Sequence, residues 1–401
     1  MQKIQQPELI SYAATKDEIS SSIKAGIHHL ILDDASISIR SWQEPKLYDN
    51  LDGLIALVNW TKETYPDVVV SVNCDGLYHS NEALLLADLD NLIHSTNLDF
   101  LRVQDVGILQ YMHKKCKCIL DMQMGNCNWV SVAEFKKLAK RQVVSMDVSY
   151  KDTCEINAKV GANLECYVHS RVLLQYSKRR FMLGNENQDE IKNPNLTQIY
   201  KLAQDEDYPG RRFSFLDNSH GHFMFAYFDR CLLRCINELI ECDFSGWIID
   251  NRGCDWDYHL DCINVYADIL KNYSQAYDIR NKLNELSKRA PRPLKPGFFK
   301  INQTDNRRYK KINMFALDDE APVAKVLDAQ KKKRLTLEVI APISVGDVLI
   351  ARHPKIDDCK FELNTLWDLN DVEITSAQAG MLVQVPWQKY IQQQAVIVRK
   401  I

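Results

Sequence analysis

Short apolar runs alternate with segments of helical spacing from Glu8 to about Tyr273, and this alternation constrains the fold more than any other feature. The run Val68–Val72 has β-branched valine at four of its five positions, as expected for a strand that is covered on both faces. Repeated strand–helix units predict a parallel sheet with helices outside it. About eight such units over roughly 265 residues favour a closed, TIM-like β/α barrel over an open sheet. No Gly-x-Gly-x-x-Gly follows the first strand, which weakens a dinucleotide-binding alternative.

The predicted elements of this barrel follow one another in strand–helix order. The strands are expected at Leu9–Ala14, His28–Asp33, Val68–Val72, Phe100–Val103, Ile119–Met122, Val143–Val148, Leu164–Val168 and Trp247–Ile249. The helices are expected at Lys16–Gly26, Leu51–Thr64, Asn81–Ser95, Ile108–Lys115, Val132–Lys140, Thr153–Val160, Asp229–Glu241 and Tyr258–Leu270. We expect an irregular insertion between the strand Leu164–Val168 and the helix Asp229–Glu241.

A second composition begins after Lys288. The segment Arg289–Gly297 carries three prolines and a glycine and is typical of a linker. Short alternating runs beyond it predict a small all-β domain, most simply a barrel. These runs are Ala324–Leu327, Arg334–Ile340, Asp347–Ala351, Met381–Val385 and Ala395–Val398. The predicted organisation is therefore a β/α barrel over residues 1–288, a linker over 289–310 and a β-barrel over 311–401.

Composition limits where the protein works and what it binds. A chain of 401 residues with 46% hydrophobic content can bury a large core. With 50 basic and 53 acidic side chains, the net charge is -3, so no global field draws the protein to nucleic acid or membrane. The N-terminus has no apolar signal core, and no uncharged run is long enough to span a bilayer. We expect a cytoplasmic protein whose 12 cysteines are reduced thiols, mostly buried as small hydrophobic side chains.

Polar residues follow the predicted strands, where β/α barrels gather their functional groups. For any one of them, loop capping and solvation are the simpler explanation. His169 stands out because it directly follows a predicted strand, and an imidazole there can hold a ligand, act as a base or orient a neighbour. The others are Asp33, Asp34, Asn73, Asp75, Gln104, Asp105, Asp121, Gln123 and Asp147.

The stretch that follows the seventh predicted strand resembles the signature of the peptidase U32 family. His169, Tyr176 and Arg179 stand where that signature has its Val-His-Gly and Tyr-Ser-Gly-Arg-Cys segments. Leu173 and Arg180 stand where the signature has two cysteines. In the family those cysteines resemble iron–sulfur ligands, because clustered thiolates are what such sites require.

Two further segments extend the resemblance. Asp217, His220 and Cys231 match a family segment with acidic residues, a His-Gly pair and a Lys-Asp-Leu-Cys that opens a helix. A cysteine near a helix start also suits an anionic ligand or a thiolate of lowered pKa. Asp250 and Arg252 resemble the family's Ile-Glu-Gly-Arg, and a carboxylate beside a guanidinium can bind a polar or carboxylated substrate. A structural ion pair that closes the last strand is the open alternative.

The resemblance implies an RNA-modification protein, like the family members that hydroxylate tRNA or ribosomal RNA bases. The catalytic set that it suggests is His169, Tyr176, Arg179, Asp217, His220, Asp250 and Arg252, with Cys231 as the counterpart of one cluster ligand. Three of the four cluster cysteines are absent and no Cys-x-x-Cys pair occurs, so neither a bound cluster nor another metal is expected. The alternative is a non-catalytic accessory subunit that binds RNA or a cluster-bearing U32 partner.

Two remaining interpretations carry less weight. Peptidase chemistry is disfavoured because neither Gly-x-Ser-x-Gly nor His-Glu-x-x-His occurs, although a Cys–His pair such as Cys231 with His169 or His220 stays open. Basic runs predict contact with RNA, while solvated turns are the commoner explanation for such runs. These runs are 178–180, 211–212, 307–311 and 331–334.

Overall fold

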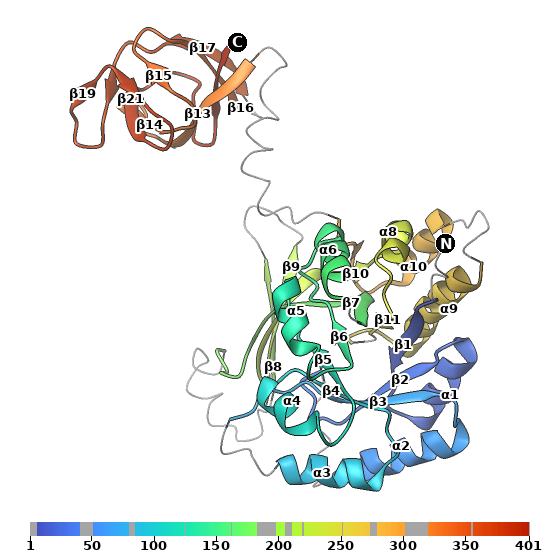
Figure 1. The fold of residues 1–401 in the computed structure, drawn as a ribbon. Coiled ribbons are helices and arrows are strands. Elements are labelled where there is room, and N and C mark those ends of the chain that lie inside the picture. Colours follow the sequence, from blue (N-terminus) through green and yellow to red (C-terminus); the bar gives the residue numbers. More distant parts are fainter. Residues whose placement is uncertain are drawn as a thin grey trace, which may run out of the picture. The chain divides into compact units, whose positions relative to one another are not determined.

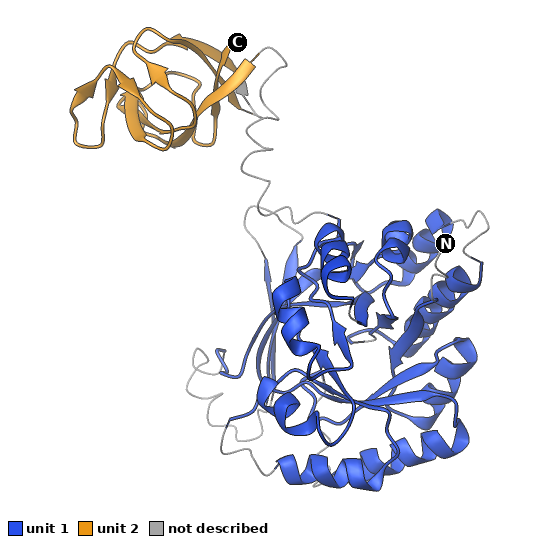
Figure 2. Cartoon of the chain, in the orientation of Figure 1, with its two compact units in different colours: residues 1–302 blue, residues 303–401 orange. Residues whose placement is uncertain are grey.

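The computed structural model describes residues 6–40, 51–79, 85–123, 125–161, 163–182, 198–204, 211–218, 220–250, 252–272, 279–300, 320–353 and 356–400. The chain forms two compact units, residues 1–302 and 303–401, which are described separately (Figure 2). Residues 301–319 lie outside the described part, so the bounds predicted for the linker, 289–310, stay a prediction.

The first unit is a closed barrel of eight parallel strands with helices between them (Figure 1), which confirms the predicted fold class. Neighbouring strands pair in chain order, and β11 pairs with both β1 and β7, which closes the ring. The strands are β1 (Glu8–Tyr12), β2 (His29–Asp33), β3 (Val69–Cys74), β4 (Phe100–Val103), β5 (Cys118–Asp121), β6 (Arg141–Val143), β7 (Leu164–Ser177) and β11 (Gly246–Ile249).

The helices of this unit begin and end at recognisable capping residues. Thr15 accepts the N–H of Glu18 at the start of the first helix, and Gly26 ends it in the left-handed conformation. Asp105, one of the polar residues at a strand end, accepts two backbone N–H groups as the cap of the fourth helix. The helices are α1 (Lys16–Ala25), α2 (Asp52–Thr64), α3 (Leu85–Ser95), α4 (Val106–Met112), α5 (Trp129–Phe135), α6 (Tyr150–Val160), η2 (Leu233–Cys235), α8 (Ile236–Glu241), α9 (Trp256–Asn272) and α10 (Ile279–Arg289).

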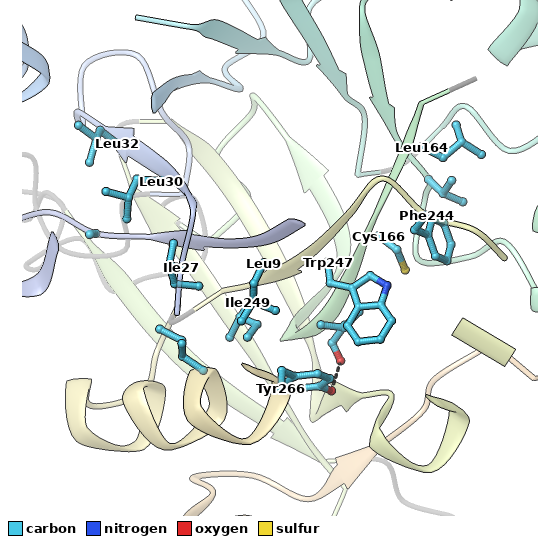
Figure 3. Close-up of a cluster of buried hydrophobic side chains, with 14 of the residues drawn as sticks. Leu9, Ile27, Leu30, Leu32, Leu164, Cys166, Phe244, Trp247, Ile249 and Tyr266 are labelled. Atoms are coloured by element: carbon cyan, nitrogen blue, oxygen red, sulfur yellow. Dashed lines mark hydrogen bonds between the residues drawn. The ribbon is translucent and has the colours of Figure 1, made fainter. Parts of the chain in front are cut away.

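The apolar strands bury both of their faces. On β2, Leu30 and Leu32 pack with the helix-side core, while Ile31 belongs to a separate cluster with barrel-lining residues such as Ile248. Figure 3 shows part of the helix-side core, in which Trp247 of β11 lies near Tyr266 of α9. Because β2 is covered on both faces, its centre, Leu30 to Leu32, is a continuous apolar run rather than an alternating one.

In its described residues, the segment expected to be an irregular insertion is largely regular, so that prediction is wrong for this part of the chain. Strand β7 does not end at Val168 but continues to Ser177, beyond the barrel, and pairs antiparallel with β10 (Gly221–Cys231). Strands β9 (Arg212–Asn218) and β8 (Ile199–Gln204) extend the same sheet. The helix predicted at Asp229–Glu241 is wrong at its start, because cross-strand pairing holds its first three residues in β10. We call the antiparallel part of this sheet the extension.

The second unit is an antiparallel sheet that curls into a half-barrel, as the alternating runs predict. Leu335, Leu337 and Val339 of β14 are buried and alternate with more exposed residues. The main sheet has the order β17-β16-β22-β13-β14-β21-β18-β19. Its strands are β13 (Glu320–Ala329), β14 (Arg334–Val339), β16 (Val348–His353), β17 (Ile356–Glu362), β18 (Leu366–Trp367), β19 (Glu373–Ile374), β21 (Leu382–Pro386) and β22 (Val396–Lys400), and β15 (Ile343–Ser344) pairs with β20 (Ser376–Ala377).

Candidate functional site

Charged side chains meet where the barrel strands end at their carboxyl termini. Arg40, from the loop after β2, donates from Nε to Asp250 Oδ1 at 2.9 Å and from Nη1 to Asp33 Oδ2 at 3.2 Å. Its guanidinium also lies 3.8 Å from the ring centre of Tyr12. Burial alone would raise the pKa of Asp250, but Arg40 and Arg252 outweigh it and lower that pKa. Asp250 is therefore ionised. We call the site formed by Asp33, Arg40, Asp250 and the residues around them the barrel mouth.

Arg252 lies in the barrel mouth, and two of its donor groups have no acceptor among the described residues. Its backbone N–H donates to Asp250 Oδ1 at 2.9 Å, and its Nε lies 3.8 Å from Asp250 Oδ2, beyond hydrogen-bond length. The Nε and Nη2 groups of Arg252 are buried without a hydrogen-bond partner among the described residues. A buried guanidinium with unused donors is costly, so these donors favour an external acceptor.

Acceptors without described partners occur at the ends of β3 and β5, at the same end of the barrel. Asp75 Oδ1 accepts the N–H of Ile39 at 2.9 Å, whereas its Oδ2 is buried without a partner among the described residues. Burial raises the pKa of Asp75, and Arg252 partly offsets this. Asn73 Oδ1 and Asp121 Oδ1 are likewise buried without described partners. The barrel mouth thus combines guanidinium donors with carboxyl and amide acceptors.

Beneath the mouth, a hydrogen-bonded chain of polar residues fills the barrel. Tyr167 donates to Asp121 Oδ2 at 2.9 Å, and its hydroxyl lies 3.0 Å from that of Tyr12. Arg102, fully buried, donates to Asp121 Oδ2 at 3.1 Å and to Glu165 Oε2 at 2.8 Å. These hydrogen bonds hold Asp121 in place through Oδ2, while its Oδ1 has no hydrogen-bond partner among the described residues.

The extension adds an aromatic wall beside the mouth. The guanidinium of Arg171 lies 4.6 Å from the ring centre of Phe225, and that of Arg252 lies 6.0 Å from it. Arg171 also donates to Ser214 Oγ at 2.7 Å. Gly253 has φ +71°, and a Cβ there would come within 2.6 Å of Arg171 Nη1, so glycine lets the Arg252 turn approach the extension.

His169 lies on the helix side of β7 rather than at the end of a strand. Its Nε2 is 3.0 Å from the Tyr258 hydroxyl and 3.5 Å from Cys262 Sγ, both on α9. Burial lowers the pKa of His169 to about 4. In the pairing of β11 with β7, Ile248 is opposite Tyr167 and Ile249 is opposite His169, so the register shifts by one residue at His169. Its catalytic role stays a prediction, and its contacts are those of a packed residue.

The other predicted residues lie on or beside the extension. Tyr176 donates to the carbonyl of His220 at 2.9 Å, and burial lowers the pKa of His220. Asp217 is buried with its Oδ1 2.5 Å from His222 Nδ1. Arg179 is exposed just after β7. The predicted set therefore divides: Asp250 and Arg252 meet in the barrel mouth, and the signature residues lie elsewhere.

Cys231 differs from what its motif suggested. It ends β10 instead of opening a helix, and it is 3% exposed, with Sγ 4.0 Å from the Tyr266 hydroxyl. Burial raises the pKa of Cys231 to about 11, so the expected thiolate of lowered pKa is wrong. All 12 cysteines are free thiols.

The residues present do not fit the iron–sulfur cluster that the family implies. Leu173, at one cysteine position of the signature, packs against Phe223 and Phe225 in an apolar cluster. Among the residues that the structure describes, no group of three or more His, Cys, Asp or Glu side chains is arranged to hold a metal ion. Iron–sulfur clusters need several converging thiolates, and Cys231 offers one protonated thiol.

Sequence reasoning missed Arg40 and Arg171. Both are buried or nearly buried arginines outside the predicted helices and strands, where no periodicity marks a side chain as inward-facing. Asn73, Asp75 and Asp121 were found by their place after strands, although that rule selects capping residues such as Asp105 equally well.

A cleft of about 700 Å³ lies at the opposite end of the barrel. Its lining includes Glu8 and Arg141, which form an ion pair at 2.7 Å. In β/α barrels this end serves stability, and the functional groups gather at the other. We therefore assign the site to the mouth, where buried donors and acceptors lack described partners.

Fold and site together define a β/α-barrel protein with a polar mouth and an appended half-barrel. Residues 15–309 match the model of peptidase family U32, and residues 320–399 match the U32 C-terminal domain. The chain belongs to the peptidase U32 family. A comparison with curated proteins finds no match.

Solved structures give partial likenesses. The C-terminal domain of a protein described as a U32 peptidase from Geobacillus thermoleovorans is 17% identical, over 20% of this chain and 90% of that one, with a TM-score of 0.19. A 2,3-dimethylmalate lyase is 10% identical, over 70% of this chain and 87% of that one, with a TM-score of 0.33. A class V chitinase from Cycas revoluta is 9% identical, over 65% and 99%, with a TM-score of 0.32. Within the described residues, no helix has the length and apolarity needed to cross a membrane.

The buried His169 predicts a pH-dependent stability. Its pKa is about 4 in the folded protein against an ordinary value of 6.5, so between these values only the unfolded chain binds the proton. Lowering the pH from 7.5 to 5 therefore removes about 2 kcal/mol of unfolding free energy through this residue. We expect His169→Gln to weaken the pH dependence of urea unfolding by about that amount. An equal effect of His94→Gln, which removes an exposed imidazole, would contradict this assignment.

Proposed function

We propose that this U32 protein acts in RNA modification, and that its barrel mouth binds the polar edge of a nucleobase. The observation that carries the proposal is the set of buried groups without described partners: Nε and Nη2 of Arg252, Oδ2 of Asp75, and Oδ1 of Asn73 and Asp121. A pyrimidine edge offers carbonyl oxygens to the guanidinium and N–H groups to the carboxyl and amide oxygens. A site that pairs donors and acceptors in this way discriminates strongly against ligands that leave them unpaired.

The wall of the mouth supports the same ligand class. Bases recognised in RNA are commonly unstacked, held on an aromatic or guanidinium face and bonded along their edges. Phe225, which is 1% exposed, packs behind the guanidinium groups of Arg171 and Arg252, and the proposal assigns the guanidinium of Arg252 as the planar face for the base. The proposal places the protein in the cytoplasm, where RNA and reduced thiols coexist.

We infer that the redox step of such a modification falls to a cluster-bearing U32 partner. Leu173 and Arg180 replace two signature cysteines, and the pKa of Cys231 is raised by burial. This chain would then recognise the RNA while the partner carries the cluster. Peptide hydrolysis, which the family name suggests, finds no support in the Asp–Arg set of the mouth.

The Arg252→Ala variant tests the proposal. We expect it to weaken binding of a fluorescein-labelled, uridine-containing single-stranded RNA at least about tenfold, because the donors to the base edge are lost. Its thermal midpoint should fall, because Arg252 compensates the buried charge of Asp250, so circular dichroism has to show that the variant is folded at the assay temperature. Fluorescence anisotropy at fixed salt measures the binding.

The matched control is Arg280→Ala, which removes an exposed arginine of α10. It should bind the RNA with a dissociation constant within about twofold of that of the unaltered protein, because it removes at most one contact with a phosphate. Equal losses in both variants would mean that charge alone, and not the mouth, attracts RNA. Undetectable binding by the unaltered protein, alone and with a cluster-bearing U32 partner, would refute the RNA role.

A further inference from the structure

Three polar residues lie in one row across the extension. In the register of β7, β10 and β9, Ser177 is paired with His222, and His222 is paired with Asp217. Residues directly opposed on neighbouring strands project from the same face, with Cβ atoms about 4.5–5.5 Å apart. The pairing thus aligns a hydroxyl, an imidazole and a carboxylate.

The carboxylate and the imidazole are already joined. Asp217 Oδ1 lies 2.5 Å from His222 Nδ1, and Asp217 Oδ2 accepts the N–H of Met182 at 2.7 Å. Asp217 is fully buried and the His222 side chain is 8% exposed, so the ring is held in one orientation. Because Asp217 engages Nδ1, Nε2 is the nitrogen left to take a proton.

The hydroxyl stands at the end of its strand. Ser177 is the last residue of β7 and is partly exposed, and its Oγ accepts the N–H of Arg179 at 3.2 Å. That bond uses an acceptor site and leaves the hydroxyl proton for a base. A side-chain rotation has to bring Ser177 to His222, and such loose nucleophile–base contacts are common in ligand-free sites.

The surroundings suggest what could bind beside this row. The ring of Phe181 lies 5.0 Å from that of His222 and is 48% exposed, and Phe215 lies 5.9 Å away on another side. These rings form apolar walls at the imidazole. Arg179, exposed two residues after Ser177, supplies a cation for an anionic part of a ligand.

We propose that Ser177, His222 and Asp217 form a nucleophilic site that hydrolyses esters or thioesters with an apolar acyl group. Ser177 Oγ attacks the carbonyl carbon while His222 Nε2 takes its proton, and the C–O or C–S bond breaks as the leaving group receives that proton. Water then attacks the acyl-serine while His222 Nε2 takes its proton, and the bond from the acyl carbon to Ser177 Oγ breaks as that proton passes to Oγ and the acid leaves. This activity is separate from the barrel mouth and does not rest on the RNA role.

A second Ser–His–carboxylate row exists but is closed to substrates. Ser71 Oγ lies 2.9 Å from His29 Nε2, and His29 Nδ1 lies 3.4 Å from Glu8 Oε2. Ser71 and His29 are completely buried in the barrel, so no ester can reach the hydroxyl. We therefore prefer Ser177 as the nucleophile because it is partly exposed to solvent, whereas Ser71, although it lies within hydrogen-bond distance of His29, is completely buried.

Labelling of the full-length protein with a biotinylated fluorophosphonate tests the proposal. An activated serine displaces fluoride and forms one stable phosphonyl ester. We expect a single adduct that peptide mapping places on Ser177. Ser177→Ala should abolish it, and His222→Gln should slow labelling at least about 100-fold, the contribution expected of a general base.

Controls keep the result interpretable. Ser344→Ala, which removes an exposed serine of the second unit, should label at the full rate. Circular dichroism checks that each variant is folded, and p-nitrophenyl butyrate hydrolysis by Ser177→Ala decides the question if His222→Gln does not fold. No serine adduct on the folded protein, labelling that is independent of His222, or ester hydrolysis that survives Ser177→Ala would overturn the proposal.

Discussion

Replacing Arg102 with methionine lowers the free energy of unfolding of the barrel by about 3–5 kcal/mol. The guanidinium of Arg102 is fully buried and bridges Asp121 and Glu165 at 3.1 and 2.8 Å. Methionine fills a similar volume but leaves the buried Asp121 without its cation and leaves Glu165 with the more distant Arg141, at 3.4 Å. The loss therefore comes from uncompensated buried charge and not from a cavity.

Urea unfolding followed by helical circular dichroism measures this loss, because the described helices belong to the first unit. The matched control is Lys137→Met, since Lys137 pairs with Glu134 on the surface with both side chains about two-thirds exposed (67% and 66%). That change should cost less than about 1 kcal/mol. A cost for Arg102→Met as small as the control's would show that the two carboxyl groups are protonated or hydrated in the folded barrel.

Trp247→Ala should cost about 3–5 kcal/mol of unfolding free energy. Trp247 is completely buried between β11 and the helices, with its ring 6.3 Å from that of Tyr266 (Figure 3). Truncation to alanine removes most of these contacts and leaves a cavity that the surrounding strands and helix cannot fill.

Trp247→Phe is the informative comparison. The indole Nε1 has no hydrogen-bond partner among the described residues, so replacement by phenylalanine reduces the buried side-chain volume but breaks no hydrogen bond. We expect it to cost about half as much as alanine or less, in the same urea experiment. Equal costs for both variants would show that the indole N–H is bonded in solution and that its loss, not the cavity, dominates.

The barrel could be predicted from the sequence because its signal is repeated. The run Val68–Val72 is valine at four of its five positions because both faces of its strand are covered, and helices such as α1 carry their own capping residues. The half-barrel was predictable for the opposite reason: one face of β14 is buried, which leaves a clean alternation.

The extension could not be predicted because its stability is not local. The residues from Asp229 to Cys231 begin an apolar pattern of helical spacing, and pairing with β7 overrides it. This pairing also decides where the signature residues lie, because it carries Tyr176 and Asp217 beyond the strands that end at the mouth.

The mouth was predictable only in part. Asp250 and Arg252 were found by a motif at a strand end, but Arg40 reaches them from a loop 210 residues away in sequence from Asp250. No spacing rule connects residues so far apart. The unpaired donors of Arg252 depend on its surroundings and are visible only in the structure.

The most direct test of this account is the iron and acid-labile sulfide content of protein purified without oxygen. We expect less than about 0.1 equivalent of each per chain and no charge-transfer absorption. Cluster ligation needs converging thiolates. The pKa of Cys231 is raised, and no group of metal-binding side chains is found among the described residues. Stoichiometric iron and sulfide would contradict it: other cysteines would then hold a cluster, and this chain would carry the redox step itself.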